Sequence, residues 1–169
     1  MDCIIRKWKL EDAAQLTEVI NNKKVQDNLR DGIPFPYSEA DAEWFINEML
    51  NADSSNTFAF AVEADDKVVG SIAAYRGNNI NFRTAELGYY IAEPFWGKGI
   101  GTSAVNQICR YIFENTDIIR IFAEPFAYNC ASCRILEKNG FEYEGTLRSN
   151  AIKNGELFDM KMYSLIRQI

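Results

Sequence analysis

The hydrophobic pattern of the N-terminal half alternates between strand and helix periods. Residues 3–8 alternate as a strand does, and apolar residues recur at helical spacing over 11–22. A second helix is predicted over 39–50, directly behind Ser38, a residue type that caps helices. Residues 31–38 contain two prolines and a glycine, so they predict a loop between the helices.

The middle of the chain is rich in strand patterns. Segments 57–63 and 67–76 flank a short acidic turn and predict an antiparallel hairpin. A further strand is predicted over 84–93, a helix over 99–115, and a buried strand over 117–126. Because one helix separates the last two strands, we expect them to run parallel.

The C-terminal part predicts a short helix and a hairpin. Asn129 suits the N-cap of a helix that ends near Lys138, with Gly140 just beyond it. Segments 141–152 and 156–166 flank an Asn-Gly pair, which strongly signals a hairpin turn. The fold class is therefore α/β (α+β), with a mixed, mainly antiparallel sheet of about seven strands and about four helices on its faces.

Composition narrows the class of protein. The 169 residues contain no linker or repeat and predict a single domain over 1–169. The net charge of −6 argues against nonspecific nucleic-acid binding and mildly favours cationic partners. No run of about 18 apolar residues and no apolar leader are present, so we expect a cytoplasmic protein without membrane contact.

The residues available for chemistry are restricted. Histidine is absent, which excludes His-dependent nucleophilic triads and the common His-based metal sites. Of the four cysteines only Cys130 and Cys133 are closely spaced, and no second pair completes a metal site, so we expect no metal. Acid–base chemistry must use Glu, Asp, Tyr, Lys, Cys or water.

The stretch FWGKGIGT at 95–102 places three alternating glycines and Lys98 at a strand-to-helix junction. Free amides at a helix start bind anions, and glycines let a phosphate approach the backbone. A triphosphate loop needs a glycine and a hydroxyl where Ala92 and Gly99 stand, and the dinucleotide fingerprint needs its third glycine one residue later. A nucleotide-binding module is therefore the weakest interpretation.

Together with NCASCRILEKNGF at 129–141, this stretch resembles the pyrophosphate loop and later half of the GNAT superfamily of N-acetyltransferases. The resemblance covers nearly the whole chain and is closest to the RimJ/RimL-like branch, which acetylates ribosomal-protein N-termini. Trp96 replaces the usual Gln or Arg of the loop. The resemblance implies a splayed pair of central strands and acetyl-CoA as co-substrate.

The resemblance also implies which residues bind the cofactor. They are Tyr89, Tyr90, Ile91, Trp96, Gly97, Lys98, Gly99, Ile100, Gly101, Thr102, Asn129 and Ser132. Asn129 has a second interpretation as a helix N-cap, and Ser132 as a first-turn polar residue that satisfies the backbone. Arg134 and Lys138 fit a solvated helix face better than a phosphate site.

The catalytic assignments follow from the same resemblance. Glu86 is the first candidate for the base that deprotonates the amine, against a salt-bridged surface glutamate, with Glu124 and Tyr128 as weaker candidates. Many relatives have a tyrosine acid where this chain has Leu136. The thiolate would then be protonated by Ser132 or by water, or would leave unassisted.

The acceptor is the least constrained part of the prediction. We expect its pocket to be built from Phe35 and Tyr37 of the 31–38 loop, with Tyr75 and Tyr90. The resulting hypothesis is direct acetyl transfer from acetyl-CoA to a primary amine, either a protein N-terminus, a polyamine or another small amine, by a monomer or homodimer. The alternative is a non-catalytic GNAT-like domain that binds CoA as a sensor or scaffold.

Overall fold

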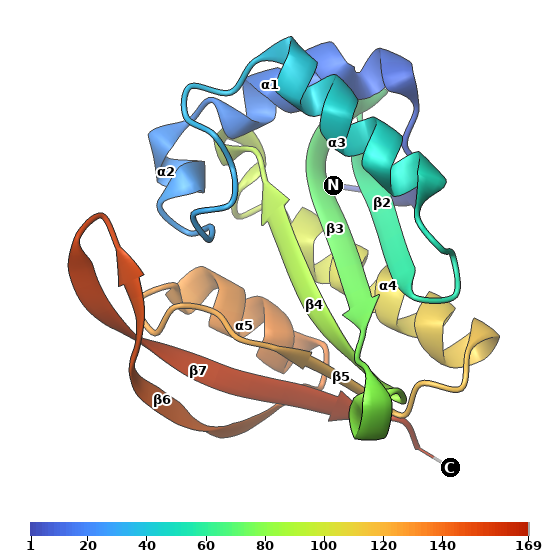
Figure 1. Ribbon diagram of the computed structural model, residues 1–169, viewed down its shortest axis with the longest axis vertical. Coiled ribbons are helices and arrows are strands. Elements are labelled where there is room, and N and C mark those ends of the chain that lie inside the picture. The colour runs from blue at the N-terminus through green and yellow to red at the C-terminus, as the bar shows by residue number, and fades with distance from the viewer. Residues whose placement is uncertain (169) are drawn as a thin grey trace.

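The computed structural model describes residues 1–168 and contains one seven-stranded sheet in the order β1-β2-β3-β4-β5-β7-β6 (Figure 1). The strands are β1 Ile4–Arg6, β2 Thr57–Ala64, β3 Lys67–Arg76, β4 Thr84–Ile91, β5 Arg120–Ala123, β6 Glu142–Lys153 and β7 Glu156–Ile166. The helices are α1 Ala13–Ile20, α2 Lys23–Gln26, α3 Glu39–Asn51, α4 Ile100–Asn115 and α5 Cys130–Lys138. All neighbouring strands are antiparallel except the parallel pair β4–β5, so the predicted fold class is confirmed.

Helices cover both faces of the sheet (Figure 1). α1 and α3 pack on one face through a cluster that includes Leu16, Ile20 and Ile46, all at most 1% exposed. α4 and α5 pack on the other face through a cluster that includes Ile108 and Leu136. As a result β3, which lies between the two layers, is buried over most of its length.

The helix starts follow their capping residues. Ser38 accepts a hydrogen bond from the Asp41 amide at the start of α3, and Asn129 accepts one from the Ser132 amide at the start of α5. The first helix is shorter than predicted, because the chain makes a single 3₁₀ turn over Leu10–Asp12 before α1. The short helix α2 has only four residues, too few for a periodic pattern to predict it.

The parallel strands β4 and β5 diverge after a short paired stretch. Their last pair in register is Glu86 with Phe122, whereas β4 continues to Ile91 and stays paired with β3 throughout. Figure 1 shows β4 and β5 leaving their common end in different directions. The predicted splayed pair is thus confirmed, and it leaves one edge of β4 without a neighbouring strand within residues 1–168.

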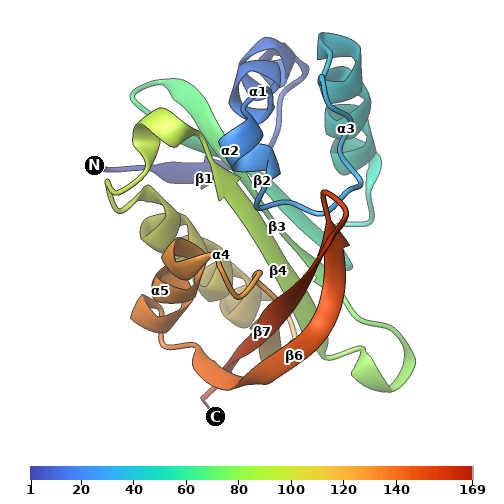
Figure 2. The same cartoon turned by 90° about the vertical axis from the view of Figure 1, so that its left-hand side faces the viewer.

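The β6–β7 hairpin extends beyond the sheet and approaches the segment that follows α2 (Figure 2). An ion pair of 2.6 Å between Lys153 Nζ and Asp31 Oδ1 joins the hairpin to this segment. The hairpin and this segment are therefore in direct contact, although they are far apart in the sequence. None of the helices in the described residues has the length and apolar character needed to cross a membrane.

Candidate active site

The glycine loop lies between β4 and α4. Gly97 and Gly99 have φ values of +72° and +81°, a left-handed conformation that side chains disfavour. A Cβ built on either residue would meet no atom within 4 Å. The first intrahelical bond runs from the Ser103 amide to the Gly99 carbonyl, at 3.0 Å, so the amides before Ser103 remain available as donors. This helix start can therefore bind an anion.

Gly101 has a different role from the other two glycines. It is buried, and a Cβ there would lie 2.7 Å from Ile135 Cδ1 of α5. The missing side chain thus lets α4 and α5 pack closely. The spacing of the three glycines suggested only that Gly101 lets a ligand approach the backbone. Nothing in the sequence indicated its contact with α5.

Two other loop residues make contacts that sequence analysis did not foresee. Trp96 donates a hydrogen bond of 2.7 Å from Nε1 to the Ile91 carbonyl, which joins the loop to the end of β4. The ammonium of Lys98 lies 5.0 Å from the centre of the Phe95 ring. Lys98 does not line the cavity that lies beside this loop.

A cavity of about 350 Å³, here called the glycine-loop cavity, lies beside this loop. Its wall contains every predicted cofactor-binding residue except Lys98. Among the described residues, the charged side chains in this wall are Arg134 and Lys138, both basic, although the chain as a whole carries −6. Sequence analysis had favoured a solvated face for these two. The cavity therefore suits an anionic ligand.

A second cavity of about 430 Å³, here called the glutamate cavity, contains Glu86, Glu124 and Arg30 in its wall. Of the residues predicted to bind the acceptor, Tyr37, Tyr75 and Tyr90 line it. Phe35 does not, and its side chain is 59% exposed. The two cavities share six lining residues: Asn28, Leu29, Tyr89, Tyr90, Asn129 and Ser132. They therefore meet at the C-terminal end of β4 and the start of α5.

Glu86 faces the glutamate cavity and is also ion-paired. Arg30 Nη2 lies 2.6 Å from Glu86 Oε1 and 3.5 Å from Glu124 Oε2. Glu86 is thus a salt-bridged glutamate in the wall of a cavity, and its role as the base stays a prediction. Tyr128, the other weak candidate for the base, does not line either cavity and donates its hydroxyl proton to the Asp27 carbonyl.

A hydroxyl pair lies where the cavities meet. The Tyr89 phenol oxygen is 2.8 Å from Ser132 Oγ, and the Ser132 amide donates to Asn129 Oδ1 at 3.2 Å. Burial raises the pKa of Tyr89, so its phenol stays protonated at neutral pH. Leu136 is fully buried in the core. The phenol near Ser132 is therefore that of Tyr89 on β4, and not one at position 136. Tyr89 and Ser132 are 43 residues apart, so no local pattern could predict their contact.

Residues 22–31, here called the bridging segment, contribute to the walls of both cavities. Asn22 Nδ2 donates to Glu93 Oε2 at 2.7 Å at one end, and Asp31 pairs with Lys153 at the other. The segment supplies Asn28 and Leu29 to both walls. It is therefore anchored at both ends independently of the Arg30 side chain.

Comparison with known families defines the class of protein. Residues 2–142 match the acetyltransferase (GNAT) domain, and the chain belongs to this family. The uncharacterized N-acetyltransferase p20 of Bacillus licheniformis is 30% identical over 165 residues, 97% of this chain and 92% of its own length. The chain is accordingly an acetyltransferase, and the expected family is confirmed.

Two solved structures share the fold at lower identity. RimL, a ribosomal L7/L12 α-N-protein acetyltransferase in complex with coenzyme A, superimposes with a TM-score of 0.86 at 21% identity, over 97% of this chain and 93% of its own. The microcin C7 self-immunity acetyltransferase MccE, in complex with acetyl-CoA and AMP, also gives 0.86, at 24% identity over 98% and 93%. Relatives of this fold therefore bind CoA and acetyl-CoA.

Proposed function

We propose that this enzyme transfers the acetyl group of acetyl-CoA to a primary amine, with acetyl-CoA in the glycine-loop cavity and the amine in the glutamate cavity. The observation that carries the proposal is the separation of charge between two cavities that meet. Two basic side chains line the first, whereas two carboxylates and one guanidinium line the second. An anionic cofactor and a cationic acceptor would each meet the opposite charge.

The residues of the glycine-loop cavity fit CoA. The open space over Gly97 and Gly99 admits phosphate oxygens to the amides at the start of α4, where the helix dipole favours negative charge. Arg134 and Lys138 add positive charge nearby. The free edge of β4 beyond Glu86 offers backbone groups to the amide-containing arm of the cofactor.

Acetyl-CoA supplies the acetyl group as an activated thioester. Glu86 accepts a proton from the acceptor's ammonium, directly or through water, so that the neutral amine can attack the thioester carbonyl. As the C–N bond forms, the C–S bond breaks and the thiolate leaves. The nitrogen then releases its remaining excess proton to water, and water supplies a proton to the thiolate. Ser132 donates a hydrogen bond to the departing sulfur, and Tyr89 holds the Ser132 hydroxyl in position.

The acceptor belongs to the class of primary amines, which includes protein N-termini, polyamines and smaller amines. RimL is a ribosomal-protein α-N-acetyltransferase, which supports a protein N-terminus as one candidate acceptor. We propose the cytoplasm as the location of this reaction.

The test is a panel of primary amines and N-terminal peptides incubated with acetyl-CoA, with release of the free CoA thiol as readout. We expect CoA to raise the melting temperature and at least one amine to accelerate thiol release. At a CoA concentration 100 times its Kd, the stabilisation would be about 2.7 kcal/mol. Stabilisation by CoA without acceleration by any amine or peptide would favour a non-catalytic CoA-binding domain. Stabilisation by ATP or NAD instead of CoA would contradict the proposal.

A further inference from the structure

The glutamate cavity contains three charged side chains that form one cluster. A single nitrogen, Arg30 Nη2, faces both Glu86 and Glu124, at 2.6 Å and 3.5 Å. Within the described part of the chain, the remaining lining residues are uncharged. One guanidinium therefore balances one of the two carboxylates and leaves the cavity with a net charge of −1.

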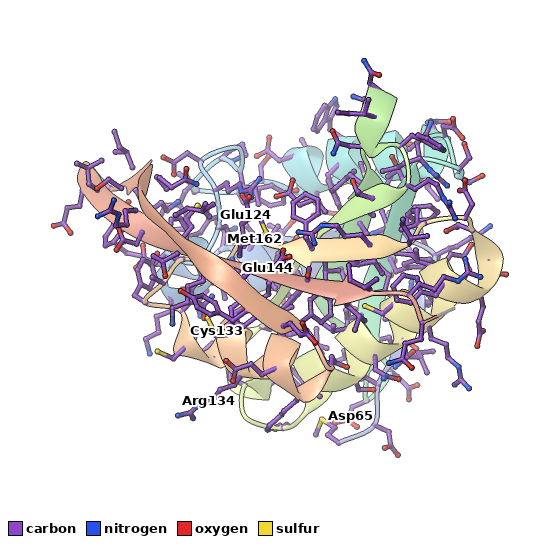
Figure 3. The ribbon with its side chains drawn as sticks, turned by 90° about the horizontal axis from the view of Figure 1, so that it is seen from below. Asp65, Glu124, Cys133, Arg134, Glu144 and Met162 are labelled. Atoms are coloured by element: carbon purple, nitrogen blue, oxygen red, sulfur yellow. The ribbon has the colours of Figure 1, made fainter. Side chains whose placement is uncertain are left out.

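The two carboxylates come from different strands, at the point where these strands separate. Glu86 belongs to the last paired position of β4 and β5, and Glu124 directly follows β5. Figure 3 shows Glu124, labelled, close to strands β5 and β7. Two carboxylates that face one cavity repel each other unless a cation lies close to both. In this structure a side chain of the protein itself provides that cation.

We propose that the Arg30 guanidinium occupies the position of the acceptor's ammonium group, and that the acceptor displaces it on binding. The inference rests on the proposed function and names the acceptor more narrowly. The acceptor is a primary ammonium group on a small apolar or aromatic body, without a carboxylate beside the amine. A carboxylate there would be repelled by Glu86 and Glu124 once Arg30 has moved away.

The rest of the wall supports an apolar or aromatic body. Tyr37, Phe45 and Phe126 lie in it, together with the aliphatic side chains of Leu29 and Ile33. Aromatic faces attract cations as well as apolar groups, so such a lining suits both parts of the acceptor. The cavity volume of about 430 Å³ is in the range of small-molecule sites.

Arg30 can leave without rearrangement of the backbone. Its side chain is 62% exposed, whereas those of Glu86 and Glu124 are 35% and 22% exposed. Ion pairs with so exposed a partner are weak. The bridging segment that carries Arg30 is anchored at both ends by other contacts, among them the pair between Asp31 and Lys153. A rotation of one long side chain is therefore sufficient to open the site.

The experiment measures binding of phenethyltrimethylammonium to the CoA-bound protein by calorimetry. This probe has a permanent positive charge and an aromatic body but no N–H bond, so it cannot be acetylated. In Arg30→Gln the competing guanidinium is absent, and we expect the Kd of the probe to fall about tenfold. The uncharged analogue phenethyl alcohol should bind the two proteins equally.

Arg110→Gln is the matched control. Arg110 is exposed on α4, pairs with Glu114 and lines neither cavity, so the variant has the same charge change elsewhere. It should leave the Kd unchanged. In the double variant of Arg30→Gln with Glu124→Gln, the gain should largely disappear, because one of the two carboxylates that attract the cation is gone.

The outcomes separate this inference from the proposed function. An unchanged or higher Kd for the probe in a folded Arg30→Gln protein overturns the inference, even if the wild-type enzyme acetylates amines. Binding of phenylalanine that is lost in Arg30→Gln also overturns it, since Arg30 would then bind a carboxylate. A tenfold gain in a protein that acetylates no amine would support the cation site and contradict the proposed function.

Discussion

Replacement of Gly99 by alanine tests the glycine loop, because the structure separates two effects of the added methyl group. Gly99 has a φ of +81°, and its built Cβ meets no atom within 4 Å. The backbone penalty of alanine in this conformation is about 1–2 kcal/mol. For a chain of this size that corresponds to a fall in melting temperature of about 2–8 °C.

The second effect of Gly99→Ala concerns the ligand. Its Cβ would enter the glycine-loop cavity, where a phosphate must approach the helix amides. Loss of one hydrogen bond to a charged group costs about 1.5–3 kcal/mol. We therefore expect the Kd for CoA, measured by calorimetry, to rise about 10- to 100-fold.

Gly155→Ala is the matched control. Gly155 has a φ of +78°, its Cβ would also meet no atom within 4 Å, and it lies in the β6–β7 turn outside the wall of the glycine-loop cavity. It should lose similar stability and keep its affinity for CoA. Equal CoA affinity in the Gly99→Ala protein and the wild type would refute the role given to the loop.

Three further predictions concern catalysis and stability. Glu86→Gln should lower kcat about 10²- to 10⁴-fold with little change in the KM for acetyl-CoA; an unchanged kcat in the thiol-release assay would exclude Glu86 as the base. Tyr89→Phe and Ser132→Ala should each lower kcat, and the double variant should be no slower than the slower single variant, because the hydroxyls act as one pair; additive losses would contradict this. Asp12 is buried, which by itself raises its pKa, but hydrogen bonds from Arg6 and the Lys9 amide outweigh burial and hold that pKa below its ordinary value. A depressed folded pKa stabilises the protein above the unfolded pKa of about 3.9 and loses this effect as the pH falls through the folded value. Asp12→Asn should therefore lower the free energy of unfolding by about 2 kcal/mol at pH 7, less than for a fully buried pair because Arg6 stays partly exposed; denaturant titrations should show the difference shrinking below pH 4, and a constant difference would contradict the assignment.

Much of the fold could be predicted because its signals are local. Ser38 and Asn129 cap the helices that follow them, and the Asn-Gly pair lies in the β6–β7 turn, as their residue types indicate. The splay of β4 and β5 was expected from family resemblance and not from periodicity. Periodicity did not indicate α2, because four residues cannot show a helical period.

The parts of the site that could not be predicted depend on contacts between distant residues. Arg30 and Glu86 are 56 residues apart, and nothing in the sequence near either residue indicates their ion pair. The role of Gly101 depends on Ile135 of another helix. Lys98 fitted the charge required by a phosphate, but its side chain lies over Phe95 instead. Residue types and their spacing thus indicated an anion site at the glycine loop. The direction in which each side chain points depends on tertiary packing, which the sequence alone does not show.

The most direct test of the two-cavity account is a crystal structure with a bisubstrate analogue, in which an acetyl bridge joins the CoA sulfur to phenethylamine. We predict the pyrophosphate at the amides of Gly99 to Thr102, the acetyl bridge beside Ser132, and the aromatic group in the glutamate cavity with the Arg30 side chain moved away. A CoA moiety bound outside the glycine-loop cavity, or an aromatic group outside the glutamate cavity, would contradict the account.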